Sequence, residues 1–257
     1  MKYNATTTRI FGLTPYFFFA MIGVVCASSL FILLLLKYGF SISRYTKIFL
    51  LSGIGLIIGG NIFGFFSRLY VALANNEPIN IDTFVTAGFV FYGGLIGFLL
   101  TFLLICKIWN KKIDYKIMDL VAVCIPLFHL WGRIGCFFAG CCYGIETHSM
   151  FSILYTTSVS GEIITASRIP IQLIESSFNI LLFAILLTLL IKHKFKKQLM
   201  IIYLSAYAIM RIIIEFFRGD LHRGVWNGIS FSQVVSVVIL IICTLIINYK
   251  RIKGERI

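Results

Sequence analysis

Residues 15–36 read PYFFFAMIGVVCASSLFILLLL, a run of 22 residues without a charged side chain. A helix needs about 20 mostly apolar residues to cross the hydrocarbon core of a bilayer. Six further stretches meet or approach this requirement, at residues 48–66, 84–106, 117–138, 171–191, 199–217 and 229–248. The sequence therefore predicts an all-α, polytopic membrane protein with seven transmembrane helices.

The composition excludes a soluble globular enzyme. Of the 257 residues, 59% are hydrophobic and 13% are charged, whereas soluble domains are about half apolar and a quarter charged. The stretches 117–138 and 199–217 are the weakest because they carry ionisable residues, and omitting both leaves five spans. We expect one integral membrane domain over residues 1–257, with a small outer segment, rich in Ser and Thr, at about 143–169.

The formal net charge of +13 is confined to four basic segments, at 37–47, 107–116, 192–197 and 250–256. These segments alternate with segments of mixed sign. By the positive-inside rule they are cytoplasmic, which predicts an outer N-terminus and a cytoplasmic C-terminus. The rest of the chain is neutral, so the excess indicates topology and contact with anionic lipids. We therefore expect no nucleic acid partner.

Arg133 lies inside the fourth predicted helix, where a charge is costly and marks a functional site by default. It is followed by Gly135, Gly140 and Gly144. Such glycines let a backbone or a ligand approach closely and expose N–H groups to an anion. This combination predicts an anion-binding site.

Arg211, Glu215 and Arg218 are spaced so that they share one face of the sixth predicted helix. The planar guanidinium group binds oxyanions in a bidentate way, so this face suits a phosphate. Glu215 would orient the arginines or neutralise them when the site is empty. The alternatives are an Arg211–Glu215 ion pair that holds helices together and a solvated outer loop that contains Arg218, Asp220 and Arg223, an interpretation favoured for Asp220 and Arg223.

The third predicted helix contains FYGGLIG at 91–97, in which Tyr92 precedes Gly93 and Gly94. Glycine pairs in membrane helices are typical of close helix packing. Tyr92 would present a hydroxyl to whatever lies beside them.

Two more polar positions are candidates for lining a cavity. Gln172 and Glu175 lie three residues apart on one face of the fifth predicted helix, just after a proline. Tyr16 lies at the outer end of the first helix, where an aromatic belt is the simpler interpretation.

Three of the seven cysteines, Cys136, Cys141 and Cys142, gather in GRIGCFFAGCCYG at 132–144. Packing beside small residues and a disulfide on an oxidising face are both open. Paired C-x-x-C spacing is absent and only His129 and His148 are near, so we predict no metal site. The remaining four are expected to be small buried hydrophobes: Cys26, Cys106, Cys124 and Cys243.

Taken together, these motifs resemble the prolipoprotein diacylglyceryl transferase family of bacterial inner-membrane enzymes. The matching pieces, in order, are YFFFAMIG at 16–23, FYGGLIG at 91–97, Asp119, GRIGCFFAGCCYG at 132–144, PIQLIE at 170–175, RIIIEFFRGD at 211–220 and SQ at 232–233. No single piece is specific, but the ordered set is.

The resemblance implies transfer of a diacylglyceryl group from phosphatidylglycerol to the thiol of a prolipoprotein signal-peptide cysteine, with release of glycerol phosphate. The implied partners are phosphatidylglycerol, the signal peptide and the lipid bilayer, with no cofactor. It also implies a multi-pass protein of the bacterial cytoplasmic (inner) membrane, with the active site toward the outer leaflet.

The resemblance also assigns roles. Arg133 and Arg211 would stabilise the charge of the leaving phosphate, and Tyr92 would position the headgroup from the place where the family has histidine. These three are the expected catalytic residues. The expected substrate-binding residues are Tyr16, Gly93, Gly94, Gly135, Cys136, Gly144, Gln172, Glu215 and Arg218.

The chain departs from the family signature GRxGNFxNxE at three positions. Cys136 and Ala139 replace the two asparagines, and Cys141 replaces the acid. These substitutions favour, as an alternative, a paralogous lipid transferase that uses the same phospholipid with a different acceptor. A small-anion transporter and a thiol redox protein are weaker alternatives.

Overall fold

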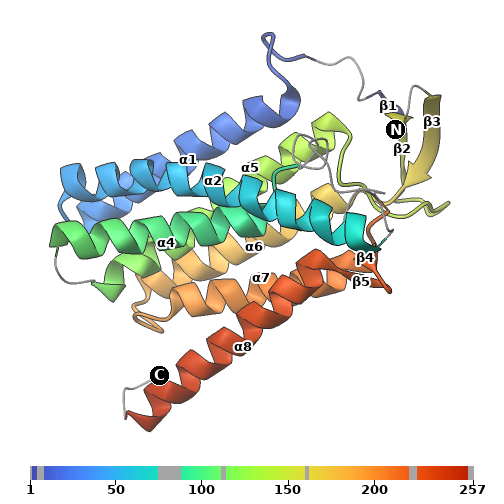
Figure 1. Ribbon diagram of the computed structural model, residues 1–257. Coiled ribbons are helices and arrows are strands. Elements are labelled where there is room, and N and C mark those ends of the chain that lie inside the picture. The colour runs from blue at the N-terminus through green and yellow to red at the C-terminus, as the bar shows by residue number, and fades with distance from the viewer. Residues whose placement is uncertain are drawn as a thin grey trace. The chain divides into compact units, whose positions relative to one another are not determined.

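The computed structural model describes residues 2–4, 9–74, 88–110, 114–159, 162–219 and 225–253. The described chain is mostly helical (Figure 1). Its seven helices are α1 (Pro15–Tyr38), α2 (Ile42–Ala74), α4 (Phe91–Asn110), α5 (Tyr115–Ala139), α6 (Ile171–Ile191), α7 (Leu199–Glu215) and α8 (Phe231–Ile252).

Each predicted span corresponds to one of these helices. The predicted bounds of α6 are correct, whereas α2 continues beyond the predicted 48–66 at both ends because helix continues into its polar flanks. Residues 84–87 of the third predicted span lie outside the described residues. By length and composition, six described helices are apolar enough to cross a membrane, and α7, with 17 residues, is not among them.

The prediction of an all-α fold is wrong in one region. Strand β2 (Ile153–Val159) pairs antiparallel with β3 (Glu162–Arg168), with Tyr155 opposite Ala166. Strand β1 (Lys2–Asn4) adds in parallel to β2. Hydropathy alone could not show this hairpin, but its many Ile, Thr and Val residues are typical of strands. A shorter pair, β4 (Val225–Trp226) and β5 (Ile229–Ser230), precedes α8.

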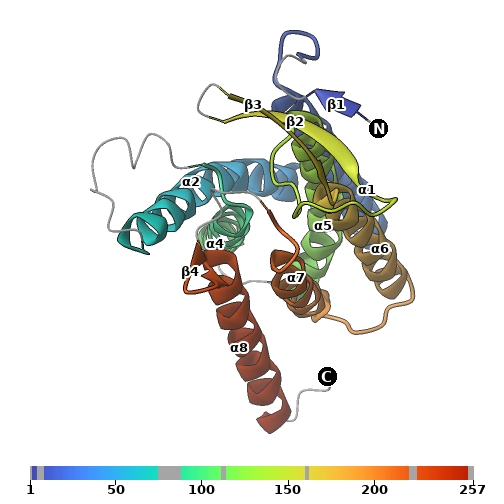
Figure 2. The ribbon, with the colours of Figure 1, turned by 90° about the vertical axis from the view of Figure 1, so that its right-hand side faces the viewer.

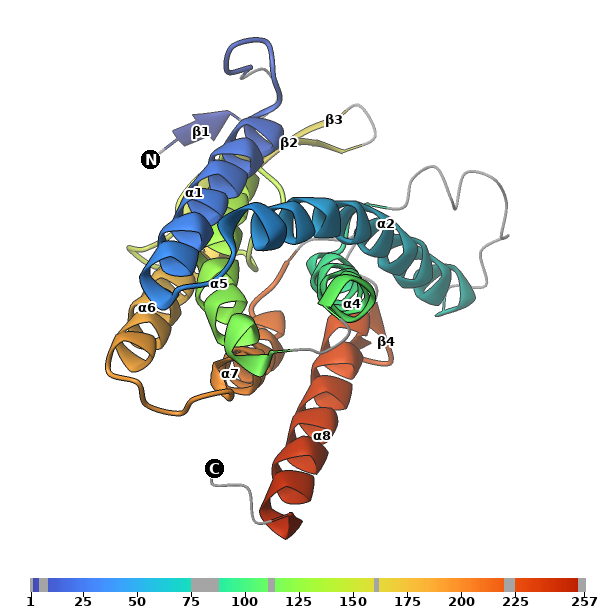
Figure 3. The same cartoon turned by 90° about the vertical axis from the view of Figure 1, so that its left-hand side faces the viewer.

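The chain divides into two compact units. The first comprises Met1–Phe31, Met118–Tyr203 and Ile213–Asp220, and the second comprises Ile32–Ile117, Leu204–Ile212 and Leu221–Ile257. Within the first unit, the hairpin of β2 and β3 lies at one end of α5 and α6 (Figure 2). Within the second unit, α2 packs across α4 (Figure 3).

Glycine sets how closely α2 and α4 approach. A Cβ atom built on Gly97 would lie 2.1 Å from the carbonyl oxygen of Gly55, and one built on Gly93 would lie 2.3 Å from that of Gly59. Any larger residue would therefore separate the two backbones. Small residues that let helix backbones touch are the usual means of packing helices in lipid.

Two helix starts are fixed by side-chain oxygens. Asp119 on α5 is buried and accepts hydrogen bonds from the backbone N–H groups of Lys197, at 2.5 Å, and Leu199, at 3.0 Å. It therefore satisfies donors at the start of α7, which explains an acid inside an apolar helix. Helix α8 begins with a capping box formed by Ser230 and Gln233.

Candidate active site

Arg133 lies on α5 and is buried against α6 in the first unit. Its Nε lies 2.7 Å from Oε2 of Glu175 and donates to Nε2 of His129 at 3.1 Å. The Glu175 side chain is fully buried, and the Arg133 side chain is 8% exposed. The sequence thus places a cation, a carboxylate and an imidazole together inside a membrane-type helix pair.

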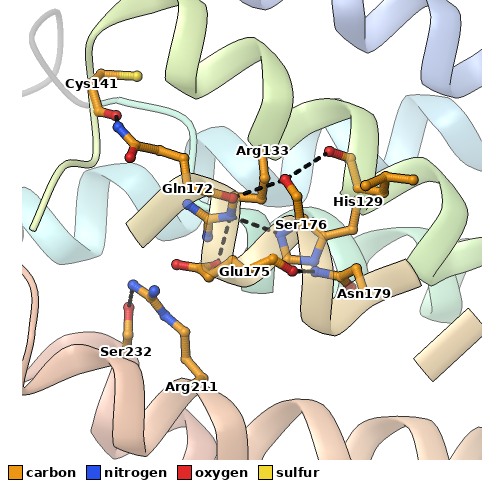
Figure 4. A network of polar contacts seen from close by, with 10 residues as sticks. His129, Arg133, Cys141, Gln172, Glu175, Ser176, Asn179, Arg211 and Ser232 are labelled. Carbon is orange, nitrogen blue, oxygen red and sulfur yellow. Dashed lines mark hydrogen bonds and ion pairs between the residues drawn. The ribbon is translucent and has the colours of Figure 1, made fainter. Parts of the chain in front are cut away.

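A polar stripe on α6 continues this network (Figure 4). Glu175 and Ser176 lie three and four residues after Gln172, Asn179 lies four residues after Glu175, and all four are buried, which puts them on one helix face. Ser176 donates to the Gln172 carbonyl at 2.9 Å, and Asn179 donates to the Glu175 carbonyl at 2.8 Å. The stripe faces the first unit's interior rather than lipid.

Gln172 connects this stripe to two other parts of the first unit. Its Nε2 donates to the Cys141 carbonyl at 2.6 Å, and its Oε1 accepts from the Tyr155 hydroxyl at 3.1 Å. Tyr155 belongs to β2 and is buried. The predicted substrate-binding residue Gln172 therefore holds the loop after α5 and the hairpin in place.

Gly144 and Arg218 are brought together by backbone pairing. The two residues form an isolated antiparallel bridge. Gly144 N–H donates to the Ile169 carbonyl at 2.9 Å, and Gly219 N–H donates to the Tyr143 carbonyl at 3.1 Å. A Cβ on Gly144 would lie 2.7 Å from the Ile169 carbonyl oxygen, so the close approach requires glycine.

This pairing corrects one prediction. Arg218 does not share a helix face with Arg211 and Glu215, because α7 ends at Glu215 and the following segment pairs with residues 143–145. Arg218 and Glu215 are nevertheless both buried in the first unit, and Glu215 is only 3% exposed. Asp220 and Arg223, which are predicted to lie in an outer loop, fall outside the described residues.

Helix α5 ends in a Schellman motif that turns the chain back over Cys136. Gly140 has a φ of +67° and donates to the Phe137 carbonyl, and Cys141 N–H donates to the Cys136 carbonyl at 3.1 Å. The sulfur atoms of Cys136, Cys141 and Cys142 all lie within 4.8 Å of one another. All three are free thiols.

The two thiols beyond α5 respond oppositely to their surroundings. Hydrogen bonds from Cys136 and Cys141 hold the pKa of Cys142 well below its ordinary value, and the guanidinium groups of Arg218 and Arg133 lower it further. For Cys141, a hydrogen bond with Cys136 lowers the pKa, but a hydrogen bond with Cys142 and burial outweigh it and raise the pKa to about 12. The cluster therefore favours one thiolate.

Tyr16 and Gly135 are neighbours in the first unit. A Cβ on Gly135 would lie 3.1 Å from Cα of Tyr16, so the glycine lets α1 approach α5. Farther along the same helix pair, Gly23 makes a similar approach to the Phe128 carbonyl, at 3.0 Å. Tyr16 itself is 37% exposed.

The second unit contains Tyr92 and Arg211, both linked to α8. The Tyr92 hydroxyl lies 2.6 Å from the Ser236 hydroxyl, and Arg211 Nη2 donates to the Ser232 hydroxyl at 3.4 Å. Ser236 donates to the Ser232 carbonyl at 2.8 Å, so Tyr92 is the donor to Ser236. Both Tyr92 and Arg211 are at most 5% exposed.

Gly93 and Gly94 lie between α4 and α2. A Cβ on Gly94 would lie 3.2 Å from the Leu56 carbonyl oxygen, and Gly93 faces Gly59 as described above. The structure gives these glycines a packing role. Their assignment to substrate binding stays a prediction.

Sequence reasoning named Glu175 only as a candidate for lining a cavity and gave His129 no place in the anion site, although both touch Arg133. A signal was present for each. His129 precedes Arg133 by four residues, one helical turn. Glu175 belongs to the polar stripe at positions 172, 175, 176 and 179, which lies on one face of a mostly apolar helix.

Apolar helices that enclose buried arginines and carboxylates define a class of integral membrane protein with an internal polar site. The sequence pattern of the family described as prolipoprotein diacylglyceryl transferase matches residues 5–249. The chain belongs to this family.

Similar proteins carry the corresponding name. The phosphatidylglycerol–prolipoprotein diacylglyceryl transferase 2 of Clostridium perfringens is 33% identical over 253 residues, which cover 96% of each chain. The Clostridium tetani transferase is 32% identical over 252 residues, covering 96% of this chain and 98% of its own. That of Helicobacter hepaticus is 30% identical over 263 residues, covering 93% and 86%.

Proposed function

We propose that the protein transfers the diacylglyceryl group of phosphatidylglycerol to the thiol of a prolipoprotein signal-peptide cysteine and releases glycerol phosphate. The observation that carries this is Arg133, a buried guanidinium held by the buried carboxylate of Glu175. In a member of this family, a fixed and desolvated cation suits an anionic lipid headgroup.

In the proposed reaction, the cysteine thiol gives up its proton. Its sulfur then attacks the carbon of the diacylglyceryl group that is bonded to the phosphate oxygen. A C–S bond forms, the C–O bond breaks, and the phosphodiester becomes a phosphate monoester that carries the released charge and takes up one proton. No electrons are exchanged with another reagent, and no metal or organic cofactor is needed.

Arg133 and Arg211 are proposed to stabilise the growing charge on the leaving phosphate, each by charge-assisted hydrogen bonds. Glu175 and His129 position the Arg133 side chain. Tyr92, whose hydroxyl is held by Ser236, is proposed to position the headgroup by accepting a hydrogen bond. The predicted substrate-binding set stays Tyr16, Gly93, Gly94, Gly135, Cys136, Gly144, Gln172, Glu215 and Arg218.

The same proposal includes the topology. We infer one integral domain in the bacterial cytoplasmic membrane, with seven spans, an outer N-terminus, a cytoplasmic C-terminus and the active site toward the outer leaflet. The alternation of basic segments supports this topology. The basic segments at 192–197 and 250–256 are both expected on the cytoplasmic side, so α7 and α8 between them must both cross, although α7 carries the buried Arg211 and Glu215.

The test is incubation of the purified protein with labelled phosphatidylglycerol and a lipobox peptide, followed by measurement of lipidated peptide and released glycerol phosphate. We expect Arg133→Ala and Arg211→Ala each to abolish both products. Arg168→Ala is the matched control, because Arg168 pairs at 2.7 Å with an exposed carboxylate, Glu146. Arg223→Ala is also expected to retain activity. Unchanged transfer in both of the first two variants would contradict the site.

A second candidate is a paralogous transferase with another acceptor. It is favoured by Cys136 and Cys141, which stand where the family has asparagine and an acid and which lie beside Cys142. The same assay separates the two functions. Phosphatidylglycerol binding without transfer to the lipobox peptide, but with glycerol phosphate released in the presence of another thiol, would support the paralogue.

A further inference from the structure

Of the three clustered cysteines, only Cys136 is assigned to the reaction proposed above, as a substrate-binding residue, and the cluster as a unit has no role in it. Helix α5 supplies Cys136, and the Schellman turn at Gly140 returns Cys141 and Cys142 to the same point. Cys142 has a φ of +61°, a backbone conformation that is uncommon for a residue other than glycine. Such strain persists where the surrounding structure imposes it, and it is enriched at functional sites.

The distances between the sulfurs fit three ligands of one ion. Three sulfurs bound to one ion at about 2.3 Å lie about 3.8–4.0 Å apart. The observed separations, all within 4.8 Å, need to close by about 1 Å at most, which rotations of the three side chains can supply. A disulfide, with sulfurs about 2.05 Å apart, would use two of the three thiols and leave the third unexplained.

The surroundings suit an anionic cluster. Coordinating cysteines are thiolates, so three of them with one cation of charge +1 or +2 leave a net negative charge. Arg133 and Arg218 act electrostatically on Cys142, which provides positive charge on the same side. The sulfurs range from buried Cys136 to exposed Cys141, which gives an ion a path from the surface.

We propose that Cys136, Cys141 and Cys142 form a three-thiolate site for a thiophilic d10 cation, Zn²⁺ or Cu⁺. Soft thiolate ligands select these ions over hard cations such as Mg²⁺. On binding, each sulfur that still carries a proton releases it to solvent, and neither the sulfurs nor the ion change oxidation state. The proposed reaction needs no metal, so this site goes beyond it, although Cys136 is also assigned to substrate binding.

The test uses the full-length protein in detergent with a non-thiol reductant and the metal alone, without lipid or peptide. Zn²⁺ and Cu⁺ are titrated separately against a competing chelator of known affinity. We expect one equivalent of at least one of these ions per chain, and protection of the three cysteines from alkylation when it is bound. The ion that binds identifies the natural ligand class.

Each single variant, Cys136→Ser, Cys141→Ser or Cys142→Ser, is expected to weaken binding by more than about 100-fold, since losing even an outer partner of a metal ligand costs 10–100-fold. Cys26→Ser and Cys243→Ser, which alter free cysteines of α1 and α8, should bind as the parent does. If Cys136→Ser does not fold, the exposed Cys141 still provides the test.

Two outcomes overturn the proposal. One is that neither ion is retained under reducing conditions. The other is that the Cys136, Cys141 and Cys142 triple serine variant retains the ion with unchanged affinity. This experiment measures metal binding and not lipid transfer. Failure of lipid transfer in the assay above therefore does not decide whether the metal site exists, and failure of metal binding does not decide whether the protein transfers lipid.

Discussion

At the scale of single residues, the buried pair of Arg133 and Glu175 is better explained by function than by stability. Taking two charges out of water costs about as much as their attraction returns, so apolar residues of similar volume serve a helix interface equally well. Here the pair is kept, with His129 on the same Nε. A requirement for Arg133 to bind an anion explains why a buried charged pair is kept at this position.

Removal of one partner of this pair should be far more damaging than removal of an exposed ion pair. We expect Arg133→Ala to lower the free energy of unfolding by about 3–5 kcal/mol, because Glu175 is left as a buried charge. Arg168→Ala, which breaks the pair with the exposed Glu146 and the contact of the guanidinium with the Tyr143 ring, should cost less, about 1–2 kcal/mol, since each of these contacts contributes up to about 1 kcal/mol. Unfolding in detergent measures both, and equal losses would contradict the burial argument.

Tyr92→Phe tests the role of one hydroxyl. The ring stays packed against Tyr207, at 5.2 Å between centroids, and the hydrogen bond to Ser236 is lost, at about 1 kcal/mol. A positioning role predicts a raised KM for phosphatidylglycerol with little change in kcat. Tyr70→Phe, in the same unit but with an exposed hydrogen bond to Ile229, is the control. A collapse of kcat alone would instead assign Tyr92 to the chemical step.

At the scale of elements, glycines at the contact points allow the helix backbones to approach closely. The glycines of α2 and α4 face each other, and Gly135 faces α1. The sequence indicated this for the Gly93–Gly94 pair, since small residues are the usual helix contacts in lipid. It could not show that Gly55 and Gly59 are the partners, because pairing depends on how two distant helices meet.

Gly97→Ala should separate α2 from α4, because its Cβ would lie 2.1 Å from the Gly55 carbonyl oxygen. Gly53→Ala on α2 has nothing within 4 Å and should be neutral or stabilising by about 0.5–1 kcal/mol, as alanine favours helix. Thermal unfolding of the two variants gives the comparison. Equal midpoints would show that the helices tolerate the wider spacing.

Asp119→Ala should destabilise the start of α7 by about 0.5–2 kcal/mol, the usual cost of losing a cap. Asp119→Asn keeps one acceptor oxygen and should lose less. The control is Asp114→Ala, since the exposed Asp114 carboxylate accepts a hydrogen bond from the Lys116 N–H, two residues away in the chain. Hydrogen exchange at the start of α7 reports the local effect, and unchanged protection in Asp119→Ala would refute the cap.

At the scale of the whole molecule, the long apolar helices could be predicted and the packing between them could not. Long apolar helices such as Pro15–Tyr38 can be recognised in the sequence from their length and hydropathy alone. The hairpin at 153–168 was missed because a search for 20-residue spans ignores short strands. Contacts such as Arg133 with Glu175 join positions 42 residues apart, and neither position alone specifies its partner.

The predicted topology can be measured directly. Reporters that are active only in the cytoplasm or only outside, fused to the C-terminus, should give signal for the cytoplasmic reporter alone. Single cysteines at Lys194 and at Ser149, in a background without native cysteines, should react with an impermeant maleimide only at Ser149 in intact cells. If α7 did not cross, Lys194 would still be cytoplasmic but the C-terminus would lie outside, so signal from the outer reporter alone would reduce the number of spans to six. Labelling at Lys194 would contradict the cytoplasmic position of the segment between α6 and α7.

The junction around Gly144 is joined by main-chain hydrogen bonds: its N–H donates to the Ile169 carbonyl, Ile145 N–H donates to the Phe217 carbonyl, and Gly219 N–H donates to the Tyr143 carbonyl. Main-chain bonds do not depend on the identity of most neighbouring side chains, so they hold these three segments together when such side chains are exchanged. Side chains near the junction can therefore be replaced by others of different chemistry without moving its backbone. Cysteine can then replace asparagine at 136 and an acid at 141, and a lineage can acquire new reactivity on an inherited scaffold.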